Sequence, residues 1–595
     1  MATFTNLQRD LSDPTRIRRR GFRLVQELCQ FVSTEDNEAE IQELVLRALE
    51  YRGEFGASEV VIDGLAREVG LFPYLDPNRL SLPDLLAYEC HRPVGLDEQT
   101  VLHHPQAVVY QTLLRGESVV LSAPTSFGKS LVIDALLASG KYDNVVVVVP
   151  TLALIDETRR RLATRFRERY KIITHRSQRP TDRNVYVLTQ ERVLERDRFQ
   201  DIDLFVIDEF YKLNPTGDDD GRSLLLNQAF YQLHKRARQF YMLGPYIERI
   251  SSGFQSRVSC RFMHETFATV VSELHPQTRG EDERAALVQL CRGLTEPTII
   301  YCQSPARAAV VSGWLVDANL GTASRELTDA ADWCDTHFHR DWHFGIALRH
   351  GIGVHHGRIP RSLAQHVVRL FNSDKIRFLV CTSTLIEGVN TQAKNIVVFD
   401  NRLDRRRLDL FTFNNIRGRS GRMMRHFIGR VYVFDEPPEG DLPEVDVPVI
   451  SQPESTPTSL LIQIDEDDLT DQSRERLRQY SNQPYVGYDT LRANVGVPLD
   501  QQVSLAREIS QNAGTMQPSL AWTGLPTYIQ LELICDLIWR HFGGTRLASR
   551  SMRTDRQLAF YVHELYNRPL TRDLIRFVFT VPRTYVRAWF LTAVL

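Results

Sequence analysis

The sequence has almost no net charge, because 72 lysine and arginine residues face 74 aspartate and glutamate residues. A formal net charge of −2 gives no reason to expect that the chain as a whole is drawn to a polyanion, so any nucleic-acid binding must come from local patches. Lysine is scarce, since only seven of the 72 basic residues are lysine. Arginine suits bidentate phosphate contacts, but a codon bias produces the same skew, and we favour that cause.

The sequence also lacks paired cysteines and long apolar runs. Its eight cysteines are scattered singly with no Cys-x-x-Cys pair, which excludes a disulfide framework and indicates a reducing compartment. No apolar run approaches the ~20 residues that a membrane-spanning helix needs, and the N-terminal residues lack the apolar core of a signal peptide. We therefore expect a cytoplasmic protein without a membrane partner.

What the sequence does contain is a long central region with α/β patterning. A chain of 595 residues is too long for one core, and we expect about three to five domains of roughly 100–200 residues each. Short apolar runs alternate with helical patterns over residues 97–255 and again over residues 256–435. The unbroken valines 145–149 are typical of a parallel strand buried on both faces. These patterns predict an α/β fold with two tandem, doubly wound parallel-sheet domains.

The regions before and after this central part do not show the α/β pattern. Residues 1–96 show helical periodicity without strand alternation, which predicts a helical N-terminal domain. Residues 436–475 are acidic and proline-rich and predict a linker. Residues 476–595 predict a mainly helical C-terminal domain, in which residues 529–542 are the strongest helical segment. Because the sequence stops within an apolar stretch, we expect it to be a truncated form of a longer protein.

A phosphate-binding loop is the most informative motif. Residues 122–130 read Ser-Ala-Pro-Thr-Ser-Phe-Gly-Lys-Ser and stand between a short apolar run and an apolar helical run. In such a strand–loop–helix setting, backbone N–H groups cradle phosphate oxygens, the lysine carries charge to the phosphates, and the serine hydroxyl is placed for Mg²⁺. Ala123 stands where the general pattern has glycine, and the alternative is a polar turn that happens to contain Gly-Lys-Ser. The predicted phosphate contacts are Ala123, Thr125, Ser126, Gly128, Lys129 and Ser130.

A pair of carboxylates follows at a distance that fits the same domain. Residues 204–207 are apolar and predict a buried strand, and Asp208 and Glu209 follow at its carboxyl end. We expect Asp208 to hold Mg²⁺ together with Ser130, and Glu209 to polarise the attacking water. The alternative for an acidic pair after a strand is a helix N-cap.

These two motifs resemble those of superfamily 2 helicases, with Asp-Glu-Phe-Tyr at residues 208–211 in the place of the DExH box, and the Ski2-like branch is the most similar. The resemblance covers about residues 100–435, and further motifs stand there in the family's order. In motif III the family's small-Ala-Thr sequence is replaced by Leu-Gly-Pro-Tyr. The segments that resemble family motifs are 105–106 (glutamine motif), 150–157 (Ia), 188–192 (Ib), 243–246 (III), 353–357 (the His-His-Gly segment), 382–390 (V) and 415–422 (VI).

The resemblance implies two RecA-like domains that bind ATP and Mg²⁺. It implies that Gln106 binds the adenine edge, and that Gly388 and Asn390 contact the nucleotide. Arg419 and Arg422 would face the γ-phosphate, and their spacing of three residues predicts that they share one helix face. Such an arginine contributes ~10³–10⁵ in rate in related NTPases. The alternative is a basic surface helix.

Hydroxyl side chains at strand ends, together with backbone N–H groups, suit the phosphates of a single nucleic-acid strand. The alternative for each threonine is a helix cap. By resemblance, residues 402–407 would form a strand-engaging hairpin, and a solvated basic turn is the alternative. The predicted nucleic-acid contacts are Pro150, Thr151, Thr189, Glu191, His356, Thr382, Ser383, Arg405 and Arg406.

Two functions follow from these motifs. The first is an ATP-dependent helicase or translocase that moves 3′→5′, by resemblance, on single-stranded or partly duplex nucleic acid, DNA rather than RNA, in DNA repair or antiviral defence. The second is a nucleic-acid-sensing ATPase switch that controls a protein partner, such as a nuclease, with little unwinding.

Overall fold

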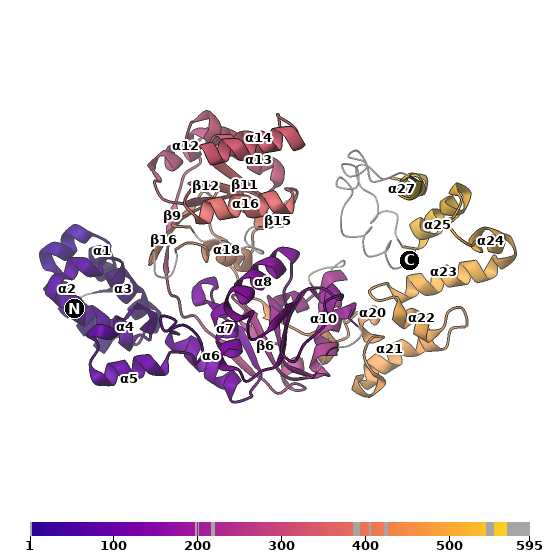
Figure 1. Cartoon of the computed structure of the whole chain (residues 1–595), viewed down its shortest axis with the longest axis horizontal. Helices are drawn as coiled ribbons and strands as arrows, with labels where there is room; N and C mark the ends of the chain where they lie inside the picture. The colour runs from indigo at the N-terminus through magenta and orange to yellow at the C-terminus, as the bar shows by residue number, and fades with distance from the viewer. Residues whose placement is uncertain are drawn as a thin grey trace. The chain divides into compact units, whose positions relative to one another are not determined.

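The computed structural model describes residues 3–196, 199, 201–215, 221–384, 393–403, 406–421, 426–542 and 553–567. The chain divides into two compact units, each described by itself below. The first comprises Met1–Thr216 and Ala229–Val447, and the second comprises Gly217–Gln228 and Pro448–Leu595. Figure 1 shows the course of the chain from the N-terminal helices in indigo to the C-terminal helices in yellow.

The first unit begins with a helical region, as the sequence predicts. Its helices are α1 (Phe4–Leu11), α2 (Pro14–Thr34), α3 (Glu38–Glu50), α4 (Glu59–Glu68) and α5 (Leu82–Cys90). Three of them start at side-chain caps, since Asp13, Asn37 and Ser81 accept hydrogen bonds from backbone N–H groups of the first turn. Leu24, Leu44 and other apolar residues of the helices form a core, which Val271 from later in the chain joins. A short 3₁₀ turn, η2 (Phe72–Tyr74), lies between α4 and α5.

Within the described residues, seven parallel strands form the first sheet in the order β3-β4-β2-β5-β6-β1-β8. Strand β2 is apolar after its first residue and buried along its whole length, as the valine run predicts. The strands are β1 (Val119–Ser122), β2 (Asn144–Val148), β3 (Lys171–Ile173), β4 (Asn184–Leu188), β5 (Ile202–Asp208), β6 (Ala237–Gly244) and β8 (Arg261–His264). The accompanying helices are α6 (His104–Leu114), α7 (Lys129–Ser139), α8 (Leu152–Phe166), α9 (Gln190–Leu194) and α11 (Ser252–Gln255), while α10 (Gly221–His234) has its first eight residues in the second unit and the rest in the first.

A second sheet of six described parallel strands has the order β11-β12-β10-β13-β16-β9. Two parallel-sheet domains in tandem confirm the predicted α/β fold class. The strands are β9 (Val271–Pro276), β10 (Thr298–Tyr301), β11 (Ile352–His355), β12 (Phe378–Cys381), β13 (Asn395–Val398) and β16 (Ile428–Val433). The helices are α12 (Glu283–Gly293), α13 (Pro305–Asp317), α14 (Arg325–His337), α15 (His343–Arg349), α16 (Arg361–Asn372) and α18 (Leu410–Arg417).

Two stretches differ from the sequence-based division. Strand β8 pairs with β1, so the first sheet extends beyond the predicted boundary at residue 255. Only one of the four residues of this edge strand is buried, and it therefore gives a weak apolar signal. The predicted linker contains β17 (Glu444–Val445), which pairs with β7 (Arg249–Ile250), and then α19 (Pro448–Ser451) and α20 (Thr458–Leu461). Apolar residues that follow the acidic, proline-rich stretch drive this folding, because they become buried.

The second unit is helical in its described residues, as the sequence predicts for the C-terminal region. Helix α25 starts at a capping box formed by Thr527 and Gln530, and it packs on α27 through Leu531, Cys535 and Leu558. The helices are α21 (Asp471–Ser481), α22 (Tyr488–Ala493), α23 (Leu499–Gln511), α24 (Ala513–Leu520), α25 (Tyr528–His541) and α27 (Asp555–Asn567). Among the described residues of the whole chain, no helix has both the length and the apolarity needed to cross a membrane.

Candidate nucleotide-binding site

The phosphate-binding loop has the predicted strand–turn–helix form. Strand β1 ends at Ser122, a 3₁₀ turn spans Thr125–Phe127, and α7 begins at Lys129. Gly128 has φ +75°, a left-handed conformation that bulkier residues rarely adopt. A Cβ atom at this position would also lie 2.7 Å from the side-chain nitrogen of Gln106. The backbone angle therefore favours glycine at position 128, and a larger residue would also have to displace the Gln106 amide.

Lys129 points back over the loop that precedes it. Its Nζ donates hydrogen bonds to the carbonyl oxygens of Ala123 at 2.8 Å and Pro124 at 3.0 Å. Burial lowers the pKa of Lys129 to about 8, against the opposing effect of the Glu209 and Asp208 carboxylates. The ammonium group thus lies in the field of both carboxylates, as a phosphate-binding lysine beside a metal-binding acid would.

Asp208 and Glu209 lie at the carboxyl end of β5. Burial raises the pKa of both, to about 7 for Glu209, where the negative charge of Asp208 adds to the effect. Glu209 has φ 60° and ψ 50°, a left-handed conformation that is uncommon for a non-glycine residue and is found at functional sites. Its Oε2 atom is buried and has no hydrogen-bond partner among the residues that the structure describes. A buried carboxylate oxygen in this state, next to a second carboxylate, fits a site that takes Mg²⁺ or an ordered water.

Gln106 forms hydrogen bonds to the backbone of the phosphate-binding loop. Its Nε2 donates to the carbonyl oxygens of Phe127 at 2.7 Å and Gly128 at 3.3 Å, and its Oε1 accepts from the backbone N–H of His103. The side chain is fully buried. Both polar ends of the amide therefore contact the protein, and the adenine contact that the resemblance implies stays a prediction.

His103 is a second residue behind the loop, at a position that no sequence motif marks. Its Nδ1 accepts a hydrogen bond from the backbone N–H of Gln106, so the proton lies on Nε2, which donates to the carbonyl oxygen of Phe127 at 3.0 Å. Burial lowers the pKa of His103 to about 3, so the ring is neutral at physiological pH. The local signal for this residue is its place as N-cap of α6.

Arg419 comes from the second parallel-sheet domain. Helix α18 ends at Arg417, so Arg419 lies in the turn that follows, and the predicted helix face shared by Arg419 and Arg422 is wrong for Arg419. Burial lowers the pKa of the Arg419 guanidinium, and the Glu209 carboxylate opposes this effect. Since Lys129 and Glu209 both interact electrostatically with Arg419, the structure brings the arginine to the site of the first domain.

Further contacts join the two parallel-sheet domains beside this site. The rings of Tyr211 and Phe411 meet edge to face, with centroids 4.6 Å apart. Gly418 lies against the loop, because a Cβ atom there would be 3.1 Å from the Thr125 hydroxyl oxygen. The turn that carries Arg419 is therefore packed directly against the phosphate-binding loop.

Ser420 anchors this turn within its own domain. Its side chain is buried, and its hydroxyl oxygen lies 2.7 Å from that of Ser272 in β9, a hydrogen-bond distance. The Ala393 N–H donates to the Arg419 carbonyl oxygen at 3.1 Å, and the Gly421 N–H donates to the Ala393 carbonyl oxygen at 2.8 Å. These hydrogen bonds fix the backbone on both sides of the Arg419 side chain.

The predicted nucleic-acid contacts have mixed surroundings. Pro150, Thr189, His356 and Thr382 are buried, whereas Glu191 and Ser383 are partly buried. Thr151 caps α8, because its hydroxyl oxygen accepts from the Leu154 N–H at 3.2 Å. Arg406 is exposed in a short hairpin of β14 (Arg402–Leu403) and β15 (Arg406–Arg407). Gly388, Asn390, Arg405 and Arg422 lie outside the described residues.

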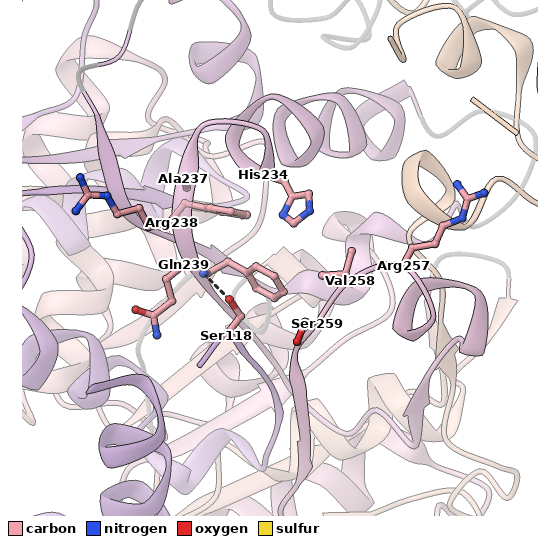
Figure 2. Close-up of a pocket in the computed structure, with 10 residues that line it drawn as sticks. Ser118, His234, Ala237, Arg238, Gln239, Arg257, Val258 and Ser259 are labelled. Carbon is pink, nitrogen blue, oxygen red and sulfur yellow. Dashed lines mark hydrogen bonds between the residues drawn. The ribbon is translucent and has the colours of Figure 1, made fainter. Parts of the chain in front are cut away.

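Figure 2 shows a cavity of about 210 Å³ where the strands of the first sheet begin, at the ends opposite to those that carry the nucleotide-binding site. It is lined by residues at the amino ends of β1 and β6, among them Ser118, Arg238 and Gln239. The Ser118 hydroxyl oxygen accepts a hydrogen bond from the Phe240 N–H, drawn as a dashed line in Figure 2. Parallel α/β sheets bind ligands at the carboxyl ends of their strands, so this cavity is not the nucleotide site.

Comparisons with protein families agree with this geometry. Residues 1–85 match the N-terminal domain of anti-bacteriophage protein B. Residues 103–243 match the DEAD/DEAH box helicase family, and residues 329–427 match the helicase conserved C-terminal domain. The two helicase matches fall on the two parallel-sheet domains.

Three relatives share sequence with this chain over different lengths. Anti-bacteriophage protein B of Escherichia coli (strain K12) is 42% identical over 450 residues, which is 73% of this chain and 61% of that protein, so the chain spans about three fifths of this relative's length. Hachiman protein HamB of Bacillus cereus is 30% identical over 118 residues, 18% of this chain and 10% of that protein. A human probable ATP-dependent RNA helicase, DDX60-like, is 33% identical over 87 residues, 15% of this chain and 5% of that protein. The resemblance of this chain to superfamily 2 helicases is therefore confirmed.

Proposed function

We propose that this chain is an ATP-dependent translocase or helicase that moves 3′→5′ on a single nucleic-acid strand and acts in antiviral defence. The observation that carries the proposal is one half-buried cluster of charges, in which Lys129, Asp208 and Glu209 of the first domain meet Arg419 of the second. The name of the E. coli relative, anti-bacteriophage protein B, supports the defence role.

The first domain supplies the groups that bind phosphate and activate water. Lys129 exchanges its two carbonyl partners for phosphate oxygens. Ser130, exposed at the start of α7, and Asp208 would hold a Mg²⁺ ion, which would supply positive charge against the phosphates. Glu209, whose pKa of about 7 is close to physiological pH, accepts a proton from the attacking water.

The second domain supplies the group that makes hydrolysis depend on closure. Arg419 stabilises the negative charge that develops in the transition state, which it can do only while the two domains are together. When the domains open after hydrolysis, Arg419 leaves the site. Each cycle of ATP hydrolysis therefore moves the two domains relative to each other while each of them binds the nucleic-acid strand.

On the strand side, backbone N–H groups at strand ends and exposed arginines carry the proposed contacts. Because Thr189 and Thr382 are buried, their side chains support the loop ends while the backbone binds phosphates. Arg402, Arg406 and Arg407 are exposed on the β14–β15 hairpin and suit a phosphate backbone. We propose DNA over RNA as the strand, a choice that ATPase stimulation by single strands of matched length decides.

Strand displacement with Mg–ATP and a 3′ overhang tests the proposal. The full chain should separate the duplex, whereas Lys129→Ala and Glu209→Gln should both fail. Lys171→Ala, a change at an exposed lysine of the same sheet, serves as the matched control and should unwind normally. Full unwinding by either site variant would contradict the proposal.

A second function, a nucleic-acid-sensing ATPase switch, is favoured by the burial of predicted strand contacts such as His356 and Thr382. In a switch, ATP-driven closure signals to a protein partner, such as a nuclease, bound at the N-terminal or C-terminal helical region. Strand-stimulated ATP hydrolysis without displacement of any overhang substrate would support the switch. Displacement of a duplex would exclude it.

A further inference from the structure

The chain crosses from the first sheet to the second through residues 265–270, between β8 and β9. Thr269 in this crossover is only 1% exposed. Its hydroxyl donates a hydrogen bond to the Ser126 carbonyl oxygen at 2.9 Å. Ser126 belongs to the phosphate-binding loop, so the crossover contacts the loop directly.

The N-terminal helical region forms hydrogen bonds with the backbone of the same crossover. The buried hydroxyl of Tyr74, in η2, donates to the Thr269 carbonyl oxygen at 3.0 Å. The Ala268 N–H donates to Oε1 of Gln42, in α3, at 3.3 Å. A chain of contacts therefore runs from the N-terminal region through Thr269 to the loop.

Three successive carbonyl groups of the loop accept hydrogen bonds from the protein. The Thr269 hydroxyl donates to the Ser126 carbonyl oxygen. His103 and Gln106 both donate to the Phe127 carbonyl oxygen, and Gln106 also donates to the Gly128 carbonyl oxygen. In a phosphate cradle the N–H groups must face the anion and the carbonyl oxygens must face away, because a carbonyl oxygen repels a phosphate. Donors behind the loop fix this orientation before the anion arrives.

The N-terminal region also reaches the second domain near motif VI. Glu50, at the end of α3, accepts hydrogen bonds at 2.7 Å from the Lys394 ammonium and from the Phe427 N–H. The ring of Phe427 meets that of Tyr74 edge to face, with centroids 4.8 Å apart. The same region thus contacts both the crossover that binds the phosphate-binding loop and the second domain.

We propose that Thr269 is a positioning residue of the nucleotide site and that the N-terminal region, through Tyr74, belongs to the ATP-binding apparatus. Thr269 keeps the Ser126 carbonyl turned away from the phosphates, and Tyr74 keeps Thr269 in place. The inference rests on the proposed ATP-binding function and adds to it a role for residues 1–96.

The test is binding of a fluorescent ATP analogue with Mg²⁺ to the full-length chain. Thr269→Val removes the hydroxyl while it preserves the shape of the side chain, and we expect about tenfold weaker binding, the loss of one buried hydrogen bond. Thr269→Ser keeps the hydroxyl and should restore binding to within about twofold. Tyr74→Phe should weaken binding by about threefold, because it acts through Thr269.

Thr112→Val is the matched control. Thr112 is also buried, and its hydroxyl donates to the Val108 carbonyl oxygen within α6. This variant should bind the analogue as the wild type does. The thermal midpoint without nucleotide measures general destabilisation, and the increase in midpoint on adding the analogue should be smaller for Thr269→Val than for Thr112→Val.

The outcomes separate this inference from the function on which it rests. If the wild type binds the analogue and Lys129→Ala does not, the ATP site stands, and equal binding by Thr269→Val and Thr112→Val then overturns the positioning role. Binding by Thr269→Ser as weak as that of Thr269→Val overturns it as well. If Thr269→Val fails to fold, normal binding by a folded Tyr74→Phe overturns the inference. Absence of binding by the wild type overturns the proposed function itself.

Discussion

The strands of the first sheet begin along one side of the sheet, which we call the amino edge, and end along the other, which we call the carboxyl edge. These two sides differ in the groups that they carry. The amino edge has a cavity of about 210 Å³, but its charged groups are solvated, and the side chain of Arg238 is 76% exposed. The carboxyl edge has Lys129, Asp208 and Glu209 in a setting that shifts the pKa of each. Taking charges out of water costs free energy, and proteins retain such groups mainly at functional sites. The half-buried, interacting charges, and not the presence of a cavity, identify the site.

The largest effect should come from Arg419→Ala, which removes the second domain's contribution to the carboxyl edge. We expect kcat for ATP hydrolysis to fall by about 10³–10⁵, with a smaller change in ATP affinity, because the arginine acts on the transition state. Steady-state ATPase assays with saturating single-stranded nucleic acid measure both quantities.

Arg430→Ala provides the matched control for this variant, since Arg430 is exposed on β16 of the same domain. Its ATPase rate should equal that of the wild type. An Arg419→Ala protein with unchanged kcat would show that the second domain plays no part in hydrolysis.

The next largest effect should come from Glu209→Gln. The change keeps the size of the side chain but removes the proton acceptor, so kcat should fall by about 10²–10⁴ while the nucleotide still binds. Glu168→Gln, at an exposed position after α8, is the control and should leave kcat unchanged. If Glu209→Gln hydrolysed ATP at the wild-type rate, another group would have to be the base.

The pH profile of kcat/KM should be bell-shaped, because kcat/KM reports on groups of the free protein. Burial and the neighbouring Asp208 raise the pKa of Glu209 to about 7, so kcat/KM should increase as the pH rises through that value and Glu209 ionises. Burial lowers the pKa of Lys129 to about 8, so kcat/KM should decrease above it as the ammonium loses its proton. A profile without the acidic limb would exclude Glu209 as the base.

The smallest effect is expected at the amino edge. The double variant Arg238→Ala and Arg257→Ala removes two charges that line the cavity and should change kcat/KM for ATP by less than about twofold. A loss comparable to that of Glu209→Gln would reverse the distinction between the two edges.

The sequence predicted those parts of the site that depend on local order. A loop between an apolar strand and an apolar helix, and an acidic pair after a buried strand, have their geometry set within a few residues. Lys129 and Asp208 therefore lie where the motifs place them. The two sheets could be predicted for the same reason, since buried parallel strands have continuous apolar runs.

Features that depend on tertiary contacts could not be predicted. Arg419 and Arg422 have helical spacing, but α18 ends at Arg417, and Gly421 takes φ +78° with no room for a Cβ atom beside Val270. Thr269 is an isolated threonine without a motif, and its contact with the loop appears only when residues 143 positions apart meet.

The most direct test of the account is single-turnover hydrolysis of Mg–ATP by the full chain with single-stranded nucleic acid, compared between the wild type and Lys129→Ala. We expect the wild type to hydrolyse ATP and Lys129→Ala to be slower by at least about 10³-fold. Hydrolysis at the same rate by both proteins would contradict the assignment of the carboxyl edge as the ATP site.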